Sequence, residues 1–478
     1  MSEIYEPVIG LEIHAQISSI TKMFCGCSND SFGKPANTNV CPICMGFPGM
    51  LPVLNEVTVK KGIRAGLALN CTIPLFSKFD RKNYFYPDLP KGFQISQYDE
   101  PVAIKGSVEI ERADGTQTVI GVTRLHLEDD AGKLTHTADG TLCDYNRSGC
   151  PLMEIVSEPD MRTVEEASAY AQQIRRILRY VGSSDCDMEK GMMRFDINVS
   201  LRKKGVEKFG TKVEVKNLNS FRALEKALVY EIERQTEMLN EGKTISQETR
   251  GWDDATGTTV SQRSKEEAHD YRYFPEPDLP PLVLQQAFID EERAALPELP
   301  LARKKRFITE YQLAVDDAIL LVEEPDLANY FEEVVKVSGD AKKSFSFVAT
   351  TLLKHLKEDH RSLEQCTVTA QQLGMLVSLV NKGALSNNQA KSEVFEVMYK
   401  TGKNPDVVMK ELGIEVVSDV GAIEALCKAA LEKNPAAVAD FKAGKEAAIG
   451  FIVGQVMKES KGKAQPAVVQ EILRKLLV

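Results

Sequence analysis

The segment GLEIH, residues 10–14, alternates apolar with polar side chains and carries an acid on its polar side. Three more segments repeat this pattern: LHLEDDAGK at 125–133, PLMEIVSEPD at 151–160 and KVEVKN at 212–217. Side chains two residues apart share one face of a β-strand. The four segments therefore predict strands whose polar faces gather acids and histidine.

A fifth segment, MRFDINVSLR at 193–202, adds basic and amide groups to this picture. Its alternation places one set of polar side chains on a single face: Arg194, Asp196, Asn198, Ser200 and Arg202. For one strand alone, the solvated face of an antiparallel sheet is the simpler interpretation. Five such strands with so many acids favour a site that takes positive charge, and a divalent metal carrying a nucleotide supplies it.

Length and composition indicate a multidomain globular protein. The chain has 478 residues, of which 43% are hydrophobic and 27% charged, and its net charge is -10. No apolar run reaches the length of a membrane span, and the acidic start MSEIYEPVIG lacks the basic region of a signal peptide. We therefore expect a cytoplasmic protein with no membrane contact, in which nucleic acid binds only through local basic patches.

The order of predicted elements favours the α+β class. Helical periodicity at 165–182 and 221–242 interrupts the strands without regular βαβ alternation. Residues 275–300 hold six of the 21 prolines, and the sequence beyond them reads as all-helical. We predict three domains: 1–295, with an insertion at about 20–50, then 296–404 and 405–478.

Four cysteines fall inside that insertion as a CxC pair and a CxxC pair: Cys25, Cys27, Cys41 and Cys44. Two close thiol pairs on turns predict a tetrahedral zinc site, and four cysteine ligands leave no open position, so the zinc would be structural. The alternative is a set of buried thiols.

Two loops mix aromatic with basic residues, at 81–101 and 263–282. Such loops stack on bases and bind phosphates, but an aromatic cluster capped by prolines explains the composition equally well.

The C-terminal tail is basic within an acidic chain. Residues 441–478 carry seven Lys or Arg and three Glu, a net of +4. Four lysines carry most of this charge: Lys445, Lys458, Lys461 and Lys463. A tRNA contact and an ordinary solvated helix face are equally consistent with the pattern.

Long strings of this sequence resemble one family, the B subunits of the tRNA-dependent amidotransferases (the GatB family). The strings are VIGLEIHAQ, RKNYFYPDLPKGFQISQ, LEDDAG, DYNRSGCPLMEIVSEPD, KNLNSF and RSKEEAHDYRYFPEPDLPP. The resemblance runs from residue 8 to about 283 and continues in the tail as GFIVGQVMKESKGKAQP.

The resemblance implies an ATP-dependent ligase that amidates Glu-tRNA(Gln) and, in many members, Asp-tRNA(Asn). The B subunit phosphorylates the side-chain carboxylate with ATP and magnesium, and ammonia then displaces the phosphate. A glutaminase partner, the A subunit, delivers the ammonia, and the small C subunit completes a heterotrimer. The family's catalytic cradle is similar to the glutamine synthetase fold, and its tail domain binds tRNA.

The resemblance also implies site residues. The catalytic and magnesium-binding set matches Glu12, His14, Glu128, Asp129, Glu154 and Glu214. We expect His14, Asp129 and Glu154 to hold one ion. We expect Glu12, Glu128 and Glu214 to hold the ion that carries the ATP phosphates. Nucleotide contacts are expected from Arg194, Asp196, Asn198, Ser200 and Lys212. Many members read Glu-Glu-Asp where this chain has Glu-Asp-Asp at 128–130.

Two other functions remain open from the residues alone. One is a free-standing ligase that joins an amine to a small amino acid, for which the basic helical tail has no use. The other is a zinc-stabilised tRNA-binding scaffold in which the acids are structural. No Walker-type phosphate loop and no Gly/Ser-rich amidase motif occurs in the sequence, so nucleotide binding needs another device and ammonia needs a partner.

Overall fold

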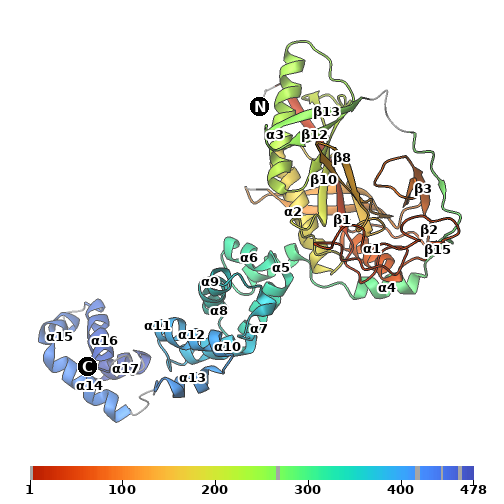
Figure 1. The fold of residues 1–478 in the computed structure, drawn as a ribbon. Coiled ribbons are helices and arrows are strands. Elements are labelled where there is room, and N and C mark those ends of the chain that lie inside the picture. The colour runs from red at the N-terminus through yellow and green to blue at the C-terminus, as the bar shows by residue number, and fades with distance from the viewer. Residues whose placement is uncertain are drawn as a thin grey trace. The chain divides into compact units, whose positions relative to one another are not determined.

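The computed structural model describes residues 4–112, 114–264, 270–414, 420–442, 445–460 and 466–477. The chain forms two compact units, residues 1–300 and 301–478, and each is described by itself (Figure 1).

The first unit is built on a sheet of eight strands in the order β13-β12-β11-β10-β1-β9-β6-β5. Their bounds are β1 (Tyr5–Gln16), β5 (Ala103–Glu111), β6 (Gln117–Asp129), β9 (Pro151–Ser157), β10 (Met193–Lys203), β11 (Val213–Leu218), β12 (Glu248–Asp253) and β13 (Thr258–Ser264). Neighbouring strands are antiparallel except β11 and β12, which are parallel. The predicted α+β class and mainly antiparallel sheet are confirmed.

One face of this sheet carries the hydrophobic core of the unit. Leu11 and Ile13 of β1 are fully buried there, together with apolar side chains of three helices: α1 (Glu56–Ala68), α2 (Val164–Tyr180) and α3 (Phe221–Asn240). The predicted helices at 165–182 and 221–242 are thus confirmed. α3 begins after Ser220, whose hydroxyl accepts a hydrogen bond from the backbone N–H of Ala223.

A smaller three-stranded sheet lies beside the C-terminal end of β6. It places β3 (Asp80–Asn83) between β4 (Phe93–Ser96) and β14 (Phe274–Pro275). The backbone N–H of Ile95 donates to the carboxylate of Asp129 at 2.8 Å, and the Ser96 hydroxyl donates to Glu128 at 3.1 Å. The aromatic-basic loop at 81–101 is therefore anchored to the acidic end of β6.

The remaining elements of the first unit are two short ribbons and one helix. β2 (Phe76–Ser77) pairs with β15 (Leu282–Val283), and β7 (Lys133–Thr137) pairs with β8 (Gly140–Asp144). α4 (Gln286–Ala294) packs on α1, where Glu292 forms ion pairs with Lys60 and Arg64 at 2.8 and 2.7 Å.

The second unit is helical throughout its described residues, as predicted. Its α-helices are α5 (Pro300–Thr309), α6 (Val315–Val322), α7 (Pro325–Ser338), α8 (Ala341–Phe347), α9 (Leu353–Glu358), α10 (Ala370–Asn381), α11 (Asn387–Gln389), α12 (Phe395–Thr401), α13 (Pro405–Glu411), α14 (Val420–Lys433), α15 (Pro435–Lys442), α16 (Ala447–Glu459) and α17 (Pro466–Leu477). Two π-helical segments, Val348–Leu352 and Ala390–Val394, and a 3-10 turn, Leu363–Gln365, complete it.

Two separate hydrophobic clusters hold this unit together. One extends from Phe307 to Met409 and the other from Ile423 to Leu477. α13 contributes Val408 and Met409 to the first cluster. Among the described residues of the whole chain, helices long and apolar enough to cross a membrane are absent.

Candidate active site on the acid-lined sheet face

Three neighbouring strands of the large sheet bring His14, Glu128 and Glu154 together. The register places His14 of β1 opposite Glu154 of β9, and Glu154 opposite His126 of β6. One ligand atom from each of His14, Glu128 and Glu154 lies within 4.8 Å of the others. We call these three residues the first acidic cluster, and the predicted convergence of β1, β6 and β9 on one face is observed.

The first acidic cluster is a network of opposite charges. The Nε2 atoms of His14 and His126 lie 3.2 and 3.3 Å from the Glu154 carboxylate. Burial alone would lower the pKa of His126, but Glu154 and Glu128 outweigh it and raise that pKa to about 9. Burial would raise the pKa of Glu154, yet the two histidines hold it well below its ordinary range. Glu154 is therefore ionised at neutral pH.

A second acidic cluster lies on the adjoining strands β1, β10 and β11. It contains Glu12, Asp196 and Glu214, with ligand atoms within 4.8 Å of one another. Lys216 joins two of its members, because its ammonium lies 2.7 Å from Asp196 and 3.0 Å from Glu214. The Asn198 amide donates to Glu12 at 2.8 Å. Burial, followed by the charge of Glu154, raises the pKa of Glu12.

Both clusters contain features that fit a bound cation. The Nδ1 atom of His14 and the Oδ1 atom of Asn198 are buried without a hydrogen-bond partner in the part of the chain that the structure describes. Buried polar atoms are normally paired, so the Oδ1 atom of Asn198 fits a missing partner beside Glu12, whereas His14 faces Glu154 through its other ring nitrogen, Nε2. The donor set is dominated by carboxylates, the ligands that Mg²⁺ prefers, and histidine is the less usual member.

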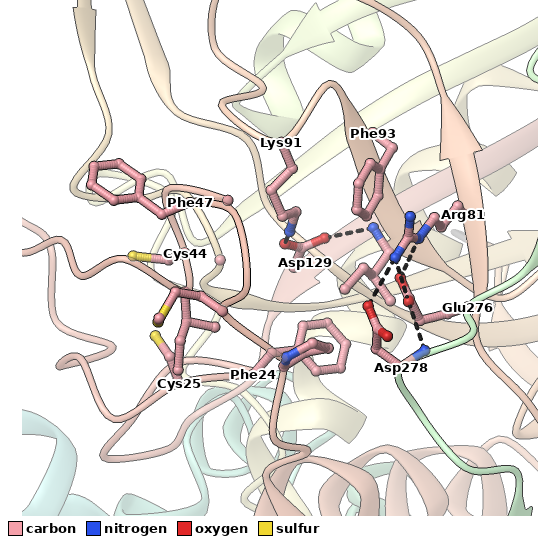
Figure 2. Close-up of a pocket in the computed structure, with 16 residues that line it drawn as sticks. Phe24, Cys25, Cys44, Phe47, Arg81, Lys91, Phe93, Asp129, Glu276 and Asp278 are labelled. Carbon is pink, nitrogen blue, oxygen red and sulfur yellow. Dashed lines mark hydrogen bonds and ion pairs between the residues drawn. The ribbon is translucent and has the colours of Figure 1, made fainter.

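The structure does not bring Asp129 to either cluster. Successive side chains of β6 point to opposite faces, so Asp129 points away from Glu128. It forms an ion pair with Lys91 and accepts the N–H of Ile95, both on the wall of a separate pocket (Figure 2). The expected placement of Asp129 beside His14 and Glu154 is therefore wrong, and Glu128 occupies that place.

This separate pocket has a volume of about 180 Å³. Figure 2 shows that it lies between the cysteine-bearing loops and β3 and β4. On its wall Arg81 forms ion pairs with Glu276 at 2.8 Å and Asp278 at 3.0 Å, and its guanidinium lies 4.3 Å from the ring centroid of Phe93.

The residues expected to contact nucleotide divide into three groups. Asp196 belongs to the second acidic cluster, and Asn198 contacts it by donating a hydrogen bond to Glu12. Arg194 forms an ion pair with Asp130 at 3.1 Å, and Ser200 is buried outside both clusters. Lys212 is exposed and precedes β11.

Sequence reasoning missed His126 and Lys216 as members of the site. Both were visible in the alternation, since His126 shares a face with Glu128 and Lys216 with Glu214. The pairing of Asp196 with Glu12 depends on the β1–β10 register, for which the sequence carries no signal.

The four cysteines of the insertion also converge. The sulfur atoms of Cys25, Cys27, Cys41 and Cys44 lie within 4.8 Å of one another. The fully buried Lys22 donates to the Asn39 carbonyl at 2.9 Å and approaches the Cys44 sulfur at 3.8 Å. A hydrogen bond from Cys25 lowers the pKa of Cys44 to about 5, and Lys22 adds to that effect. The hydrogen bond with Cys44 raises the pKa of Cys25, and burial raises the pKa of Cys27 to about 11. The convergence of four sulfur atoms, not their protonation in the free protein, is what fits a zinc site.

The described lysines of the tail are exposed on helix ends and turns. Lys445 pairs with Asp440 at 2.9 Å, and Lys458 lies in α16. Lys461 and Lys463 lie outside the described residues, as do Lys265 and His269 of the second aromatic-basic loop.

Comparison with known families gives a consistent assignment for both units. A family model described as "GatB/GatE catalytic domain" matches residues 7–290, and one described as "GatB domain" matches residues 329–477. The first match covers the whole acid-lined face, so the class of this unit is the catalytic domain shared by GatB and GatE proteins.

Full-length relatives narrow the assignment. The chain is 51% identical over 475 residues to the B subunit of the aspartyl/glutamyl-tRNA(Asn/Gln) amidotransferase of Carboxydothermus hydrogenoformans, covering 98% of both chains. It is 50% identical over 474 residues to the corresponding B subunits of Thermodesulfovibrio yellowstonii and Caldanaerobacter subterraneus subsp. tengcongensis, covering 99% of each chain. The chain therefore belongs to the GatB family, and the resemblance seen in the sequence is confirmed.

Proposed function

We propose that this chain activates the side-chain carboxylate of glutamate on Glu-tRNA(Gln), of aspartate on Asp-tRNA(Asn), or of both, by phosphorylation with ATP. Ammonia then displaces the phosphate to give the amide. The observation that carries this proposal is the pair of acidic clusters on one sheet face, built by five neighbouring strands. Family membership supports it, since the named relatives are amidotransferase subunits.

The chemistry requires activation because a carboxylate is a poor electrophile. In the first step a carboxylate oxygen bonds to the γ-phosphorus and the bond to ADP breaks. In the second, ammonia bonds to the carbonyl carbon, loses a proton, and inorganic phosphate leaves. Splitting one difficult reaction in this way lowers each barrier. Phosphoryl transfer depends mainly on positioning and on neutralising charge.

The geometry revises our expected metal ligands. We assign one magnesium ion to His14, Glu128 and Glu154, and a second to Glu12, Asp196 and Glu214. When bound, the ions would neutralise charge on the transferring phosphoryl group.

The chain's own residues orient these ligands and contact the nucleotide. His126 holds Glu154 in place, and Lys216 orients Asp196 and Glu214. Arg194, Asn198 and Ser200 remain candidate nucleotide contacts, and Lys216 is better placed than Lys212.

Other parts of the proposal concern partners and stability. The chain would receive ammonia from a glutaminase partner, the A subunit, and would assemble with the small C subunit in the cytoplasm. Cys25, Cys27, Cys41 and Cys44 would hold a structural zinc ion. The tail lysines Lys445, Lys458, Lys461 and Lys463 would contact tRNA phosphates.

We also propose the three-domain division and the likeness of the catalytic unit to the glutamine synthetase fold. The two hydrophobic clusters of the second unit support a division into a middle and a tail domain. Because α13 packs into the first of them, the boundary belongs after residue 414.

The test uses the assembled complex with Glu-tRNA(Gln), ATP, magnesium and free ammonium, which bypasses glutamine hydrolysis. The measured quantity is Gln-tRNA formed by wild type and by Glu154→Ala. Product from the wild type alone supports the proposal. Equal product from both would leave this chain as a tRNA-binding scaffold, and amidation of free glutamate in place of the ester would favour a small-substrate ligase.

A further inference from the structure

Lys82 lies in the central strand of the small sheet, on the opposite side from Arg81. β3 is hydrogen-bonded to β4 and β14, and its alternation sends Arg81 and Lys82 to different faces. Arg81 points into the pocket of Figure 2, where Glu276 and Asp278 neutralise it. Lys82 lies on the other side, within the electrostatic influence of Glu128 and Glu154.

Aromatic rings hold the half-buried Lys82 ammonium. It lies 5.0 Å from the ring centroid of Tyr271 and 5.9 Å from that of Tyr84. These two rings pack edge to face, with centroids 5.7 Å apart. The ring of Tyr273 packs against that of Tyr271, with the two ring centroids 6.1 Å apart. Cation–π contacts fix the position of an ammonium group without cancelling its charge.

Three other cations near the acid-lined face are already paired with carboxylates. Lys216 contacts Asp196 and Glu214, Arg194 contacts Asp130, and Lys91 contacts Asp129. Among the described residues, no carboxylate lies within ion-pair distance of Lys82. Its positive charge is therefore available to a ligand.

The charge on Lys82 persists at neutral pH. Burial lowers its pKa, but Glu128, Tyr273 and Glu154 outweigh burial, so that the pKa lies above its ordinary value. The ammonium keeps its proton and acts as a fixed cation, not as an acid or a base.

We propose that Lys82 binds an oxyanion of the reacting pair: the acceptor carboxylate or the phosphoryl group that joins it. This inference rests on the proposed function. The acceptor carboxylate and the γ-phosphate are both negatively charged, so bringing them together costs electrostatic energy, and the Lys82 ammonium offsets part of that cost. As the carboxylate oxygen bonds to phosphorus and the bond to ADP breaks, Lys82 donates a hydrogen bond and retains its proton.

The experiment compares wild type, Lys82→Met and Lys82→Arg in the complete complex, with free ammonium as the nitrogen source. Lys243→Met is the matched control, because Lys243 is exposed beyond the end of α3 and pairs with Glu241. We expect kcat/KM for amidation to fall on the order of 10²-fold in Lys82→Met. Lys82→Arg should recover a large part of this loss, and Lys243→Met should match wild type.

Two binding measurements identify the oxyanion and exclude a purely structural effect. If Lys82 holds the acceptor carboxylate, Lys82→Met will lose the preference for Glu-tRNA(Gln) over uncharged tRNA(Gln). If it holds the phosphoryl group, the Kd for ATP will rise instead. Either result, with an unchanged unfolding temperature, supports the proposal. If Lys82→Met is unfolded, Lys82→Gln takes its place in the same comparison.

The outcomes separate this inference from the function on which it rests. No Gln-tRNA from the wild type would overturn both. An active wild type beside an equally active Lys82→Met would overturn the role of Lys82 alone. The role of Lys82 would also be overturned if Lys82→Met lost activity but kept both its preference for Glu-tRNA(Gln) and its Kd for ATP. The same holds if the activity of Lys82→Arg were no higher than that of a folded Lys82→Met.

Discussion

The acid-lined sheet face and the basic tail both carry concentrated charge, but they differ in how that charge is held. On the sheet, antiparallel register brings Glu12 against Asp196, which is 184 positions away in the printed sequence. In the tail, Lys445 pairs with Asp440, which is a neighbour in sequence. Buried charges that are held by partners distant in sequence indicate a preorganised functional site. Exposed charges on helices contribute little energy, so one lysine can be replaced with little effect.

The largest expected effect is the difference in kcat between variants of Glu128 and Asp129, two adjacent acids on opposite faces of β6. Glu128→Gln should reduce kcat for ammonium-dependent amidation on the order of 10²–10³-fold, because it removes a carboxylate from the first acidic cluster. Asp129→Asn should reduce kcat by less than about tenfold. The large loss is expected only for a charged group at the reacting centre, and Asp129 lies outside it. Steady-state kinetics of both variants checks this, and a greater loss in Asp129→Asn would contradict our placement of the metal.

The cysteine cluster should respond next most strongly. Cys44→Ser removes one of four converging sulfur atoms, so zinc should be lost and the free energy of unfolding of the first unit should fall by about 3 kcal/mol. Metal analysis together with thermal unfolding measures both effects. Cys143→Ser is the control, because Cys143 lies outside the cluster. Full zinc content in Cys44→Ser would exclude this site.

A buried acid outside the acid-lined face should affect stability alone. Burial would raise the pKa of Glu292, but Lys60 and Arg64 hold it below its ordinary value of 4.5. A depressed carboxyl pKa stabilises the fold above the unfolded-state pKa, and that stability is lost as the pH falls through the folded-state pKa. Glu292→Gln should therefore cost about 1 kcal/mol at neutral pH, and the difference from wild type should shrink below pH 4.5.

Denaturant unfolding at several pH values tests this prediction. A constant difference between Glu292→Gln and wild type from neutral to acidic pH would show that the ion pairs of Glu292 are not its source.

The smallest effect belongs to the tail. Lys458→Gln should weaken tRNA binding only a few-fold at low salt, and the difference should diminish as salt rises, because each phosphate contact releases counterions. Lys428→Gln is the control, since Lys428 lies in α14, ahead of the basic tail at 441–478, and is already paired with Glu424 at 2.8 Å. Equal affinities of wild type and Lys458→Gln at every salt concentration would assign Lys458 to an ordinary solvated face.

Alternation along single strands was enough to predict the strands, the faces and most of the acids. The same rule excludes Asp129 from the first acidic cluster, because its side chain cannot share a face with that of Glu128. Its expected place there came from the family resemblance, not from the alternation. The grouping of Asp196 with Glu12 and Glu214 could not be predicted from the sequence, because strand order and register are set by the whole sheet. The cysteine cluster was predictable from spacing alone, but the buried Lys22 beside it was not.

The central claim is that the acid-lined face forms an acyl phosphate, and oxygen transfer tests it most directly. The tRNA would be charged with glutamate whose side-chain carboxylate carries ¹⁸O, and the complex supplied with ATP, magnesium and free ammonium. Our account predicts that each Gln-tRNA formed releases inorganic phosphate containing one ¹⁸O atom, because the bridging oxygen comes from the carboxylate. Phosphate without ¹⁸O, alongside normal Gln-tRNA formation, would contradict it.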